Sequence, residues 1–255
     1  MRAIGRTKRL KKVTAGRLVY AVCYTQPMAS DGPKTRAAKS KCSTEARKRM
    51  NLKLAWQKLE QLLAANFDRG DLMVTLTFDD EHLPPDREGA QKCARRFLRL
   101  LRDYRHKHGT KLEYCYCIER HPEESGGYDR LHIHMILNST GFDYDIIRGL
   151  WEFGENITFT RLQDYDSYET LAKYLTKEPR AANNAYGKRC WIPSKGLRKP
   201  EVTSEMVDDS LTLTAPPGAF ILEREGPWQN TYGEFMYIKY LLPEPEKVPP
   251  KLNTD

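Results

Sequence analysis

The sequence predicts an α+β fold in which helices pack on one face of a central antiparallel β-sheet. Two stretches, residues 44–66 and 87–107, repeat apolar residues at steps of three and four, which is typical of amphipathic helices. Three shorter stretches, residues 72–78, 112–120 and 130–137, alternate in side-chain character as half-buried strands do. Both kinds of pattern recur along one chain, which favours helices layered on a sheet.

Composition narrows the class of protein and of partner. The chain has 255 residues, of which 40% are hydrophobic, and can bury one good core. Its net charge of +8 favours a polyanionic partner, with nucleic acid ahead of a membrane. Neither a signal peptide nor a membrane-spanning run is expected. Six scattered cysteines predict free thiols in a reducing cytoplasm.

The two ends of the chain differ in character from its middle. Residues 1–43 predict a basic arm with a short strand at residues 18–24, and such an arm is either solvated or a clamp for phosphates. Residues 44–200 carry the regular patterns of one domain. Short alternating segments at 201–243 predict a small β-extension, and a disordered tail is expected at 244–255.

The elements of the middle region can be placed in order. Ser43 or Thr44 can cap the first helix, and the turn at residues 68–70 leads into the strand at 72–78. After the helix at 87–107, the strands at 112–120 and 130–137 are joined by a loop with two glycines, which predicts an antiparallel hairpin. Three elements follow: a short helix capped by Asp143 or Asp145, a strand at 157–162, and a helix at 168–177 capped by Asp166 or Ser167.

Strand alternation gathers polar residues on one face of the sheet. If the apolar residues of the three strands face the same helices, the opposite face must carry a polar set. That set comprises Thr75, Thr77, Cys115, Cys117, Glu119, His132 and His134.

Three interpretations of the His132 and His134 pair are open at this point. Histidines one residue apart can be a simple surface pair on an edge strand. With Cys115 and Cys117 they could form a structural zinc site, although cysteines two positions apart on a strand hold their sulfurs about 7 Å apart, which is too far for zinc without distortion. With Glu119 they form two imidazoles and a carboxylate with open positions, which suits a catalytic Mg²⁺ or Mn²⁺.

The last helix of the middle region carries a candidate nucleophile. Tyr174 and Lys177 stand three residues apart and therefore share a face of the helix. A tyrosine on an amphipathic helix is ordinarily a core residue. The neighbouring lysine and the predicted metal site favour a catalytic role instead.

The ordered set of these motifs resembles that of HUH endonucleases. The residues are the strand at 75–78, the pair His132 and His134, and the helix with Tyr174 and Lys177. More closely, the chain is similar to rolling-circle replication-associated proteins of small phages and plasmids. The similarity extends to residues 65–67, 118–120, 150–154 and 194–200, and it covers roughly residues 44–200.

The resemblance implies a fold like that of RNA-recognition domains and a strand-transfer reaction. Tyr174 would attack single-stranded DNA to give a 5′-phosphotyrosine link and a free 3′-hydroxyl. A divalent metal, Mg²⁺ or Mn²⁺, would be held by Glu119, His132 and His134, and Lys177 would stabilise developing charge. Tyr168 is expected to be a packing residue of a single-tyrosine enzyme, and His121 a loop residue.

Partners and alternatives complete the prediction. Single-stranded or hairpin origin DNA is the expected substrate, with host DNA polymerase and helicase as partners in a bacterial cytoplasm and no membrane. No phosphate-binding loop of a helicase is found in the sequence. A single-tyrosine transposase, a relaxase or a non-catalytic zinc-stabilised DNA-binding protein are the alternatives. The expected DNA contacts are Thr75, Thr77, Arg120, Lys173, Lys195 and Arg198.

Overall fold

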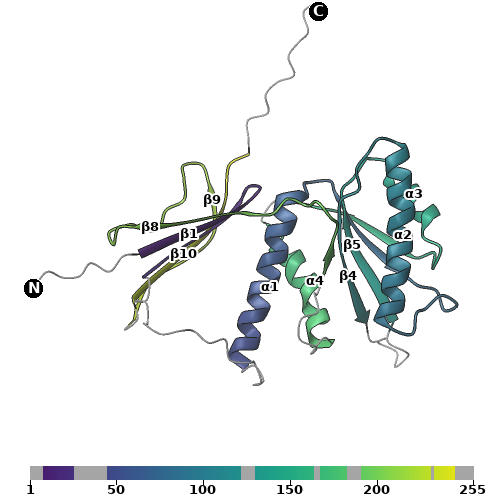
Figure 1. The fold of residues 1–255 in the computed structure, drawn as a ribbon, viewed down its shortest axis with the longest axis horizontal. Coiled ribbons are helices and arrows are strands. Elements are labelled where there is room, and N and C mark those ends of the chain that lie inside the picture. Colours follow the sequence, from purple (N-terminus) through teal and green to yellow (C-terminus); the bar gives the residue numbers. More distant parts are fainter. Residues whose placement is uncertain are drawn as a thin grey trace, which may run out of the picture. The chain divides into compact units, whose positions relative to one another are not determined.

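The computed structural model divides the chain into two compact units, each with its own antiparallel sheet (Figure 1). It describes residues 8–25, 45–121, 130–163, 167–182, 191–230 and 233–244. The central unit spans residues 42–198, and the terminal unit combines residues 1–41 with 199–255. Sheets packed against helices confirm the predicted α+β class.

The sheet of the central unit has five strands in the order β6-β3-β5-β4-β7. Its middle strand, β5, carries His132 and His134 and lies between β3 and β4. The predicted hairpin of β4 and β5 is confirmed by their antiparallel pairing. The strands are β3 (Leu72–Thr77), β4 (Tyr114–His121), β5 (Arg130–Leu137), β6 (Ile157–Arg161) and β7 (Ile192–Pro193). The helices are α1 (Glu45–Asn66), α2 (Arg87–Lys107), α3 (Asp143–Leu150) and α4 (Glu169–Ala182).

Helices cover both faces of this sheet (Figure 1). On one face α2 and α3 pack over the alternating apolar residues of the strands, among them Leu76, Ile133 and Met135. On the other face α1 and α4 pack over a second core that includes Cys115 and Ile136. The prediction placed helices on one face only, with the opposite face polar and open.

The second face is apolar at one end and polar at the other, which explains why it binds helices. Its row across the strands at Met73, Ile136 and Cys115 is apolar, and Ile136 and Cys115 are buried. The polar prediction relied on the threonines and histidines and gave no weight to these apolar neighbours. The polar rows lie further along the strands and form the candidate site described below.

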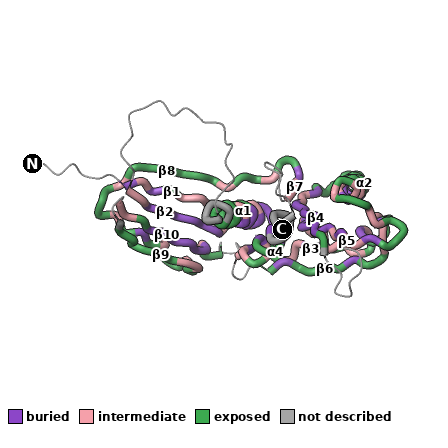
Figure 2. The backbone as a smooth tube through the Cα atoms, turned by 90° about the horizontal axis from the view of Figure 1, so that it is seen from below, coloured by how far each residue is buried: buried purple, intermediate pink, exposed green. Residues whose placement is uncertain are grey.

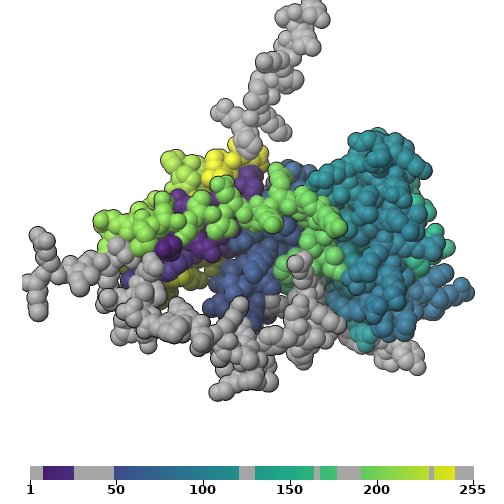
Figure 3. Space-filling model, viewed as in Figure 1, coloured from purple at the N-terminus to yellow at the C-terminus, as the bar shows by residue number. Residues whose placement is uncertain are grey.

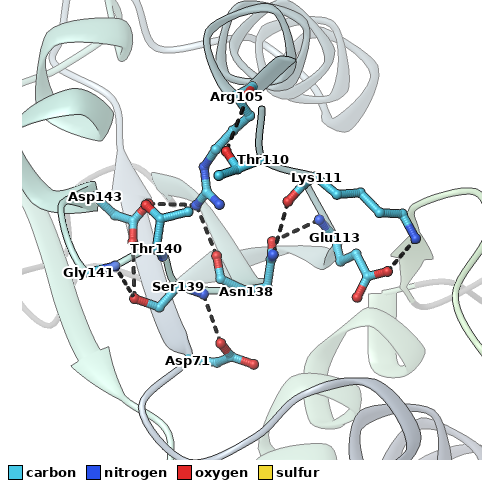
Figure 4. Close-up of polar contacts among 10 residues, drawn as sticks. All are labelled: Asp71, Arg105, Thr110, Lys111, Glu113, Asn138, Ser139, Thr140, Gly141 and Asp143. Carbon is cyan, nitrogen blue, oxygen red and sulfur yellow. Dashed lines mark hydrogen bonds and ion pairs between the residues drawn. The ribbon is translucent and has the colours of Figure 1, made fainter. Parts of the chain in front are cut away.

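A buried polar network fixes the loop between β5 and α3 (Figure 4). The Arg105 guanidinium donates to Asp143 Oδ1 at 2.5 Å, and both side chains are 2% exposed. Asp143 also accepts from the Thr140 amide at 2.7 Å and the Ser139 hydroxyl at 3.0 Å. Asp143 is therefore the first residue of α3 and a partner of Arg105, and the predicted capping role at this helix is wrong, because Phe142 occupies the cap position.

The terminal unit is built from both ends of the chain. Its sheet has the order β8-β1-β2-β10-β9, so that two strands from the N-terminal region pair with three from the C-terminal region. Figure 2 shows buried positions on β1, β2 and β10, and mostly exposed ones on β8. The strands are β1 (Lys8–Ala15), β2 (Leu18–Thr25), β8 (Glu201–Val207), β9 (Phe220–Asn230) and β10 (Gly233–Leu241).

The region predicted as an arm over residues 1–43 thus contributes two strands. The basic residues of β1 conceal its strand character, because lysines occupy positions that alternation assigns to the core. Lys8 is only 5% exposed; its amine lies 3.2 Å from Glu234 Oε2 and donates to the Asp209 carbonyl. Apart from residue 244, the predicted tail lies outside the described residues.

Among the helices in the described part of the chain, none is long and apolar enough to cross a membrane.

Candidate functional site

Two adjacent rows of residues cross the middle of the central sheet. Thr77, His132 and Glu119 are direct partners across β3, β5 and β4, and the next row contains Thr75, His134 and Cys117. Directly paired residues of antiparallel strands point to the same face. The shared face predicted from alternation is therefore confirmed.

The imidazole of His134 is held at both of its nitrogens. Its Nε2 lies 2.7 Å from Glu119 Oε2, and its Nδ1 lies 3.0 Å from Thr75 Oγ1. Both His134 and Glu119 are only 4% exposed. Glu119 is the direct strand partner of His132 but leans along the sheet to contact His134. The ring orientation is fixed by two side chains from the two neighbouring strands.

Tyr174 lies against this histidine from helix α4. The two ring centroids are 5.4 Å apart and the ring planes meet at 74°, an edge-to-face contact. The tyrosine is 37% exposed, whereas the histidine beneath it is buried. A phenol in this position reaches solvent while one edge of its ring rests on the buried site.

Helix α4 is positioned by contacts with α1 and the sheet. Ala172 and Leu175 are buried in the second core. The Lys173 amine lies 4.7 Å from the centre of the Trp56 ring and pairs with Glu169. Since Lys173 and Ala172 flank the same turn as Tyr174, these contacts set where the phenol lies.

Other predicted residues near the site can now be placed. Tyr168 is 5% exposed and its hydroxyl donates to the Phe67 carbonyl at 2.9 Å, which confirms its packing role. His121 is the last residue of β4 and pairs with Arg130, so its prediction as a loop residue is wrong. Lys177 lies within α4, but its side chain is outside the part that the structure describes.

The donor atoms of the predicted metal site converge only in part. Glu119 and His134 contact each other directly, and His132 is the strand partner of Glu119. Across the described residues, no three His, Cys, Asp or Glu side chains are grouped as a metal site. The residue types suit Mg²⁺ or Mn²⁺, and the convergence of two of the three supports the fit.

The two cysteines of the alternative zinc site belong to the second core. Cys115 and Cys117 are 2% and 3% exposed and pack with residues of α1 and α4. Burial raises the pKa of the Cys115 thiol well above its usual value, so the thiolate that zinc requires is disfavoured there. The position of these thiols speaks against the zinc interpretation.

The predicted DNA contacts are distributed over several surfaces. Thr75 contacts His134, and the Thr77 hydroxyl donates to the Asn156 carbonyl at 2.5 Å. Lys173 is engaged with Trp56 and Glu169, as described above. Arg120, Lys195 and Arg198 are exposed.

Asn66 has a role that the sequence did not reveal. It is 6% exposed; its side-chain amide donates to the Arg198 carbonyl at 2.9 Å, and its Oδ1 accepts from the Arg198 amide at 2.6 Å. At the other end of the same segment, the Ser194 amide donates to the Tyr114 carbonyl at 2.7 Å. Two motifs noted separately in the sequence, at 65–67 and 194–200, are thereby joined.

Trp151 and Gly154 hold the end of strand β3. The indole of Trp151 donates to the Thr77 carbonyl at 2.9 Å. A Cβ at Gly154 would lie 2.7 Å from that same carbonyl oxygen and 2.9 Å from the Asp79 amide nitrogen, so only glycine fits there. Their spacing in the sequence is the signal that marked them, but it gave no indication of this contact.

The central unit thus combines an antiparallel sheet, a buried histidine and carboxylate on its middle strands, and a tyrosine from a neighbouring helix. Residues 71–179 match a family model described as Replication-associated protein, of the ORF2 type. The matched segment contains Thr75, Glu119, His132, His134 and Tyr174, and the match is consistent with a replication initiator. Comparisons with curated proteins and with solved structures found no match.

Proposed function

We propose that this protein initiates replication by cutting and rejoining single-stranded origin DNA through Tyr174. The observation that carries the proposal is the contact between the part-exposed Tyr174 ring and buried His134, which itself pairs with Glu119. All three residues lie in the segment that matches the replication-associated family model. That match favours an initiator over a transposase or a relaxase with the same chemistry.

The reaction exchanges one phosphodiester for another. The Tyr174 oxygen attacks the scissile phosphorus, a bond forms between them, and the bond from phosphorus to the 3′-oxygen breaks. The 5′ end of the strand remains on the tyrosine, and the 3′-oxygen takes up a proton to become a free hydroxyl. The same hydroxyl rejoins the strand by the reverse attack. A host polymerase would extend it, and a host helicase would separate the strands.

A tyrosine needs help to act as a nucleophile, because the reference pKa of its hydroxyl is about 10. Glu119, His132 and His134 are the residues that would hold a divalent ion, Mg²⁺ or Mn²⁺. Such an ion, when bound, polarises the scissile phosphate. We assign charge stabilisation near the phosphate to Lys177, which shares the helix face of Tyr174.

Thr75 orients His134 for this role. A histidine that binds a metal through Nε2 must carry its proton on Nδ1, and that proton needs an acceptor. The Thr75 hydroxyl lies 3.0 Å from Nδ1 and can accept as well as donate. The same contact therefore serves the metal-free pair with Glu119 and the metal-bound state.

The test uses two tyrosines of the same region. Tyr174→Phe should abolish cleavage of a labelled single-stranded origin hairpin and the covalent adduct, while binding of the hairpin persists. Tyr168→Phe is the matched control: it removes one hydroxyl from a buried tyrosine that packs near Phe67, and it should leave the adduct intact. An adduct that forms at full yield in the Tyr174→Phe protein would refute the proposal.

A further inference from the structure

Five side chains form one continuous row across the sheet of the terminal unit. Arg9 on β1 is the direct partner of Met206 on β8 and of Tyr24 on β2. Tyr24 pairs with Phe235 on β10, and Phe235 pairs with Trp228 on β9. Because direct partners point to the same face, the row spans all five strands on one side of the sheet.

The row is exposed, unlike the opposite face of the same sheet. Trp228 is 64% exposed, Met206 is 47% exposed and Phe235 is 39% exposed. Residues next to the row on the opposite face, such as Cys23, are fully buried in the core of this unit. Large apolar side chains gathered at an exposed position mark a surface of interaction. Figure 3 shows part of β8, in light green, on the surface of this unit.

Charge is distributed unevenly along the row. Arg9 lies between the aromatic residues and Met206, and exposed Lys11 lies two positions further on β1, on the same face. None of the five residues of the row is acidic. The nearest acidic residue of the next row is Glu225, on the edge strand β9 opposite Tyr237. Cationic groups thus lie over β1, and aromatic faces over β2, β10 and β9.

We propose that this row binds single-stranded nucleic acid, with unpaired bases stacked on Trp228, Phe235 and Tyr24 and the phosphates held by Arg9 and Lys11. Aromatic side chains beside basic groups are what strands without a fixed sequence require, since every base has a face that stacks. The chain's net charge of +8 suits this partner, and a purely apolar partner would have to cover the Arg9 charge. The choice of DNA as the strand rests on the proposed function.

Binding of the full chain to an unstructured oligothymidine, followed by fluorescence anisotropy with chelator present, tests the aromatic part. Trp228→Ala should weaken binding about five- to a hundredfold, the loss of one stacked base. Phe220→Ala is the matched control. Phe220 is also on β9 and 61% exposed, but it pairs with Leu241, about 20 Å from the row at strand spacing, and its loss should change nothing.

The charged part is tested with two arginines. Arg9→Ala should reduce the slope of log affinity against log salt by about one, because one phosphate contact is lost. Arg224→Ala changes the net charge equally, but Arg224 pairs with Ile238 of the opposite face, and the slope should stay as in the wild type.

Unchanged oligothymidine binding in the Trp228→Ala protein would overturn the proposal. It would equally be overturned if Trp228→Ala dissolved a dimer of the chain and left binding intact, since a second copy would then be the occupant. The outcome is independent of the nicking chemistry. Trp228→Ala at saturating DNA should form the Tyr174 adduct normally, and a chain that forms no adduct could still bind through the row.

Discussion

His134 concentrates the chemistry of the central unit in one side chain. Its two ring nitrogens contact Glu119 and Thr75, and its ring edge meets Tyr174. Three different elements therefore converge on one imidazole. This arrangement couples the predicted metal ligands to the predicted nucleophile without any further residue between them.

Thr75→Val tests whether the threonine orients the histidine. Valine keeps the β-branched shape but removes the acceptor for the Nδ1 proton, so Mn²⁺ should bind about 10- to 100-fold more weakly. Calorimetric titration with Mn²⁺ measures this loss apart from activity. Thr77→Val is the control, because the Thr77 hydroxyl donates to the Asn156 carbonyl and pairs in the row of His132. Equal Mn²⁺ affinity in the wild-type and Thr75→Val proteins would refute the orienting role.

At the scale of elements, strand alternation predicted the site face because alternation is a local property of each strand. It placed Thr75, Glu119 and His134 together, and the register confirms this. It could not predict that Glu119 reaches diagonally to His134, since that depends on side-chain conformation. Nor did it predict α1 and α4 over the second face, because their packing depends on the apolar row at Met73 and Ile136.

The segment after β7 is held to α1 by one side chain, and Asn66→Ala should release it. The substitution leaves the buried amide and carbonyl of Arg198 without their partner, and the free energy of unfolding should fall by about 1–3 kcal/mol. Hydrogen exchange should accelerate at residues 194–198 more than elsewhere. Lys58→Ala, at an exposed position of the same helix, should change neither quantity. Unaltered exchange in the Asn66→Ala protein would contradict the clamp.

At the scale of the whole molecule, the chain closes one sheet from its two ends. Strands β1 and β8 pair although they lie nearly two hundred residues apart, as the partners Lys8 and Val207 show. Sequence patterns cannot reveal such pairing, because a lysine-rich strand shows no clear alternation and the partner is remote. The terminal unit was therefore predicted as an arm and a separate extension.

Removal of residues 199–255 tests this organisation. The hairpin of β1 and β2 would lose both neighbouring strands, and an isolated hairpin is marginally stable at best. Amide exchange at residues 8–25 should become fast, whereas β3, β4 and β5 should keep their protection. Slow exchange at residues 8–25 in the shortened chain would show that the hairpin does not depend on β8 and β10.

The most direct test of the central claim is the identity of the residue that carries DNA. The wild-type protein is incubated with a single-stranded origin hairpin and Mn²⁺, digested with protease, and the DNA-linked peptide is sequenced by mass spectrometry. The account predicts a 5′-phosphotyrosine link at Tyr174. A link at any other residue, or complete cleavage without a link, would contradict it.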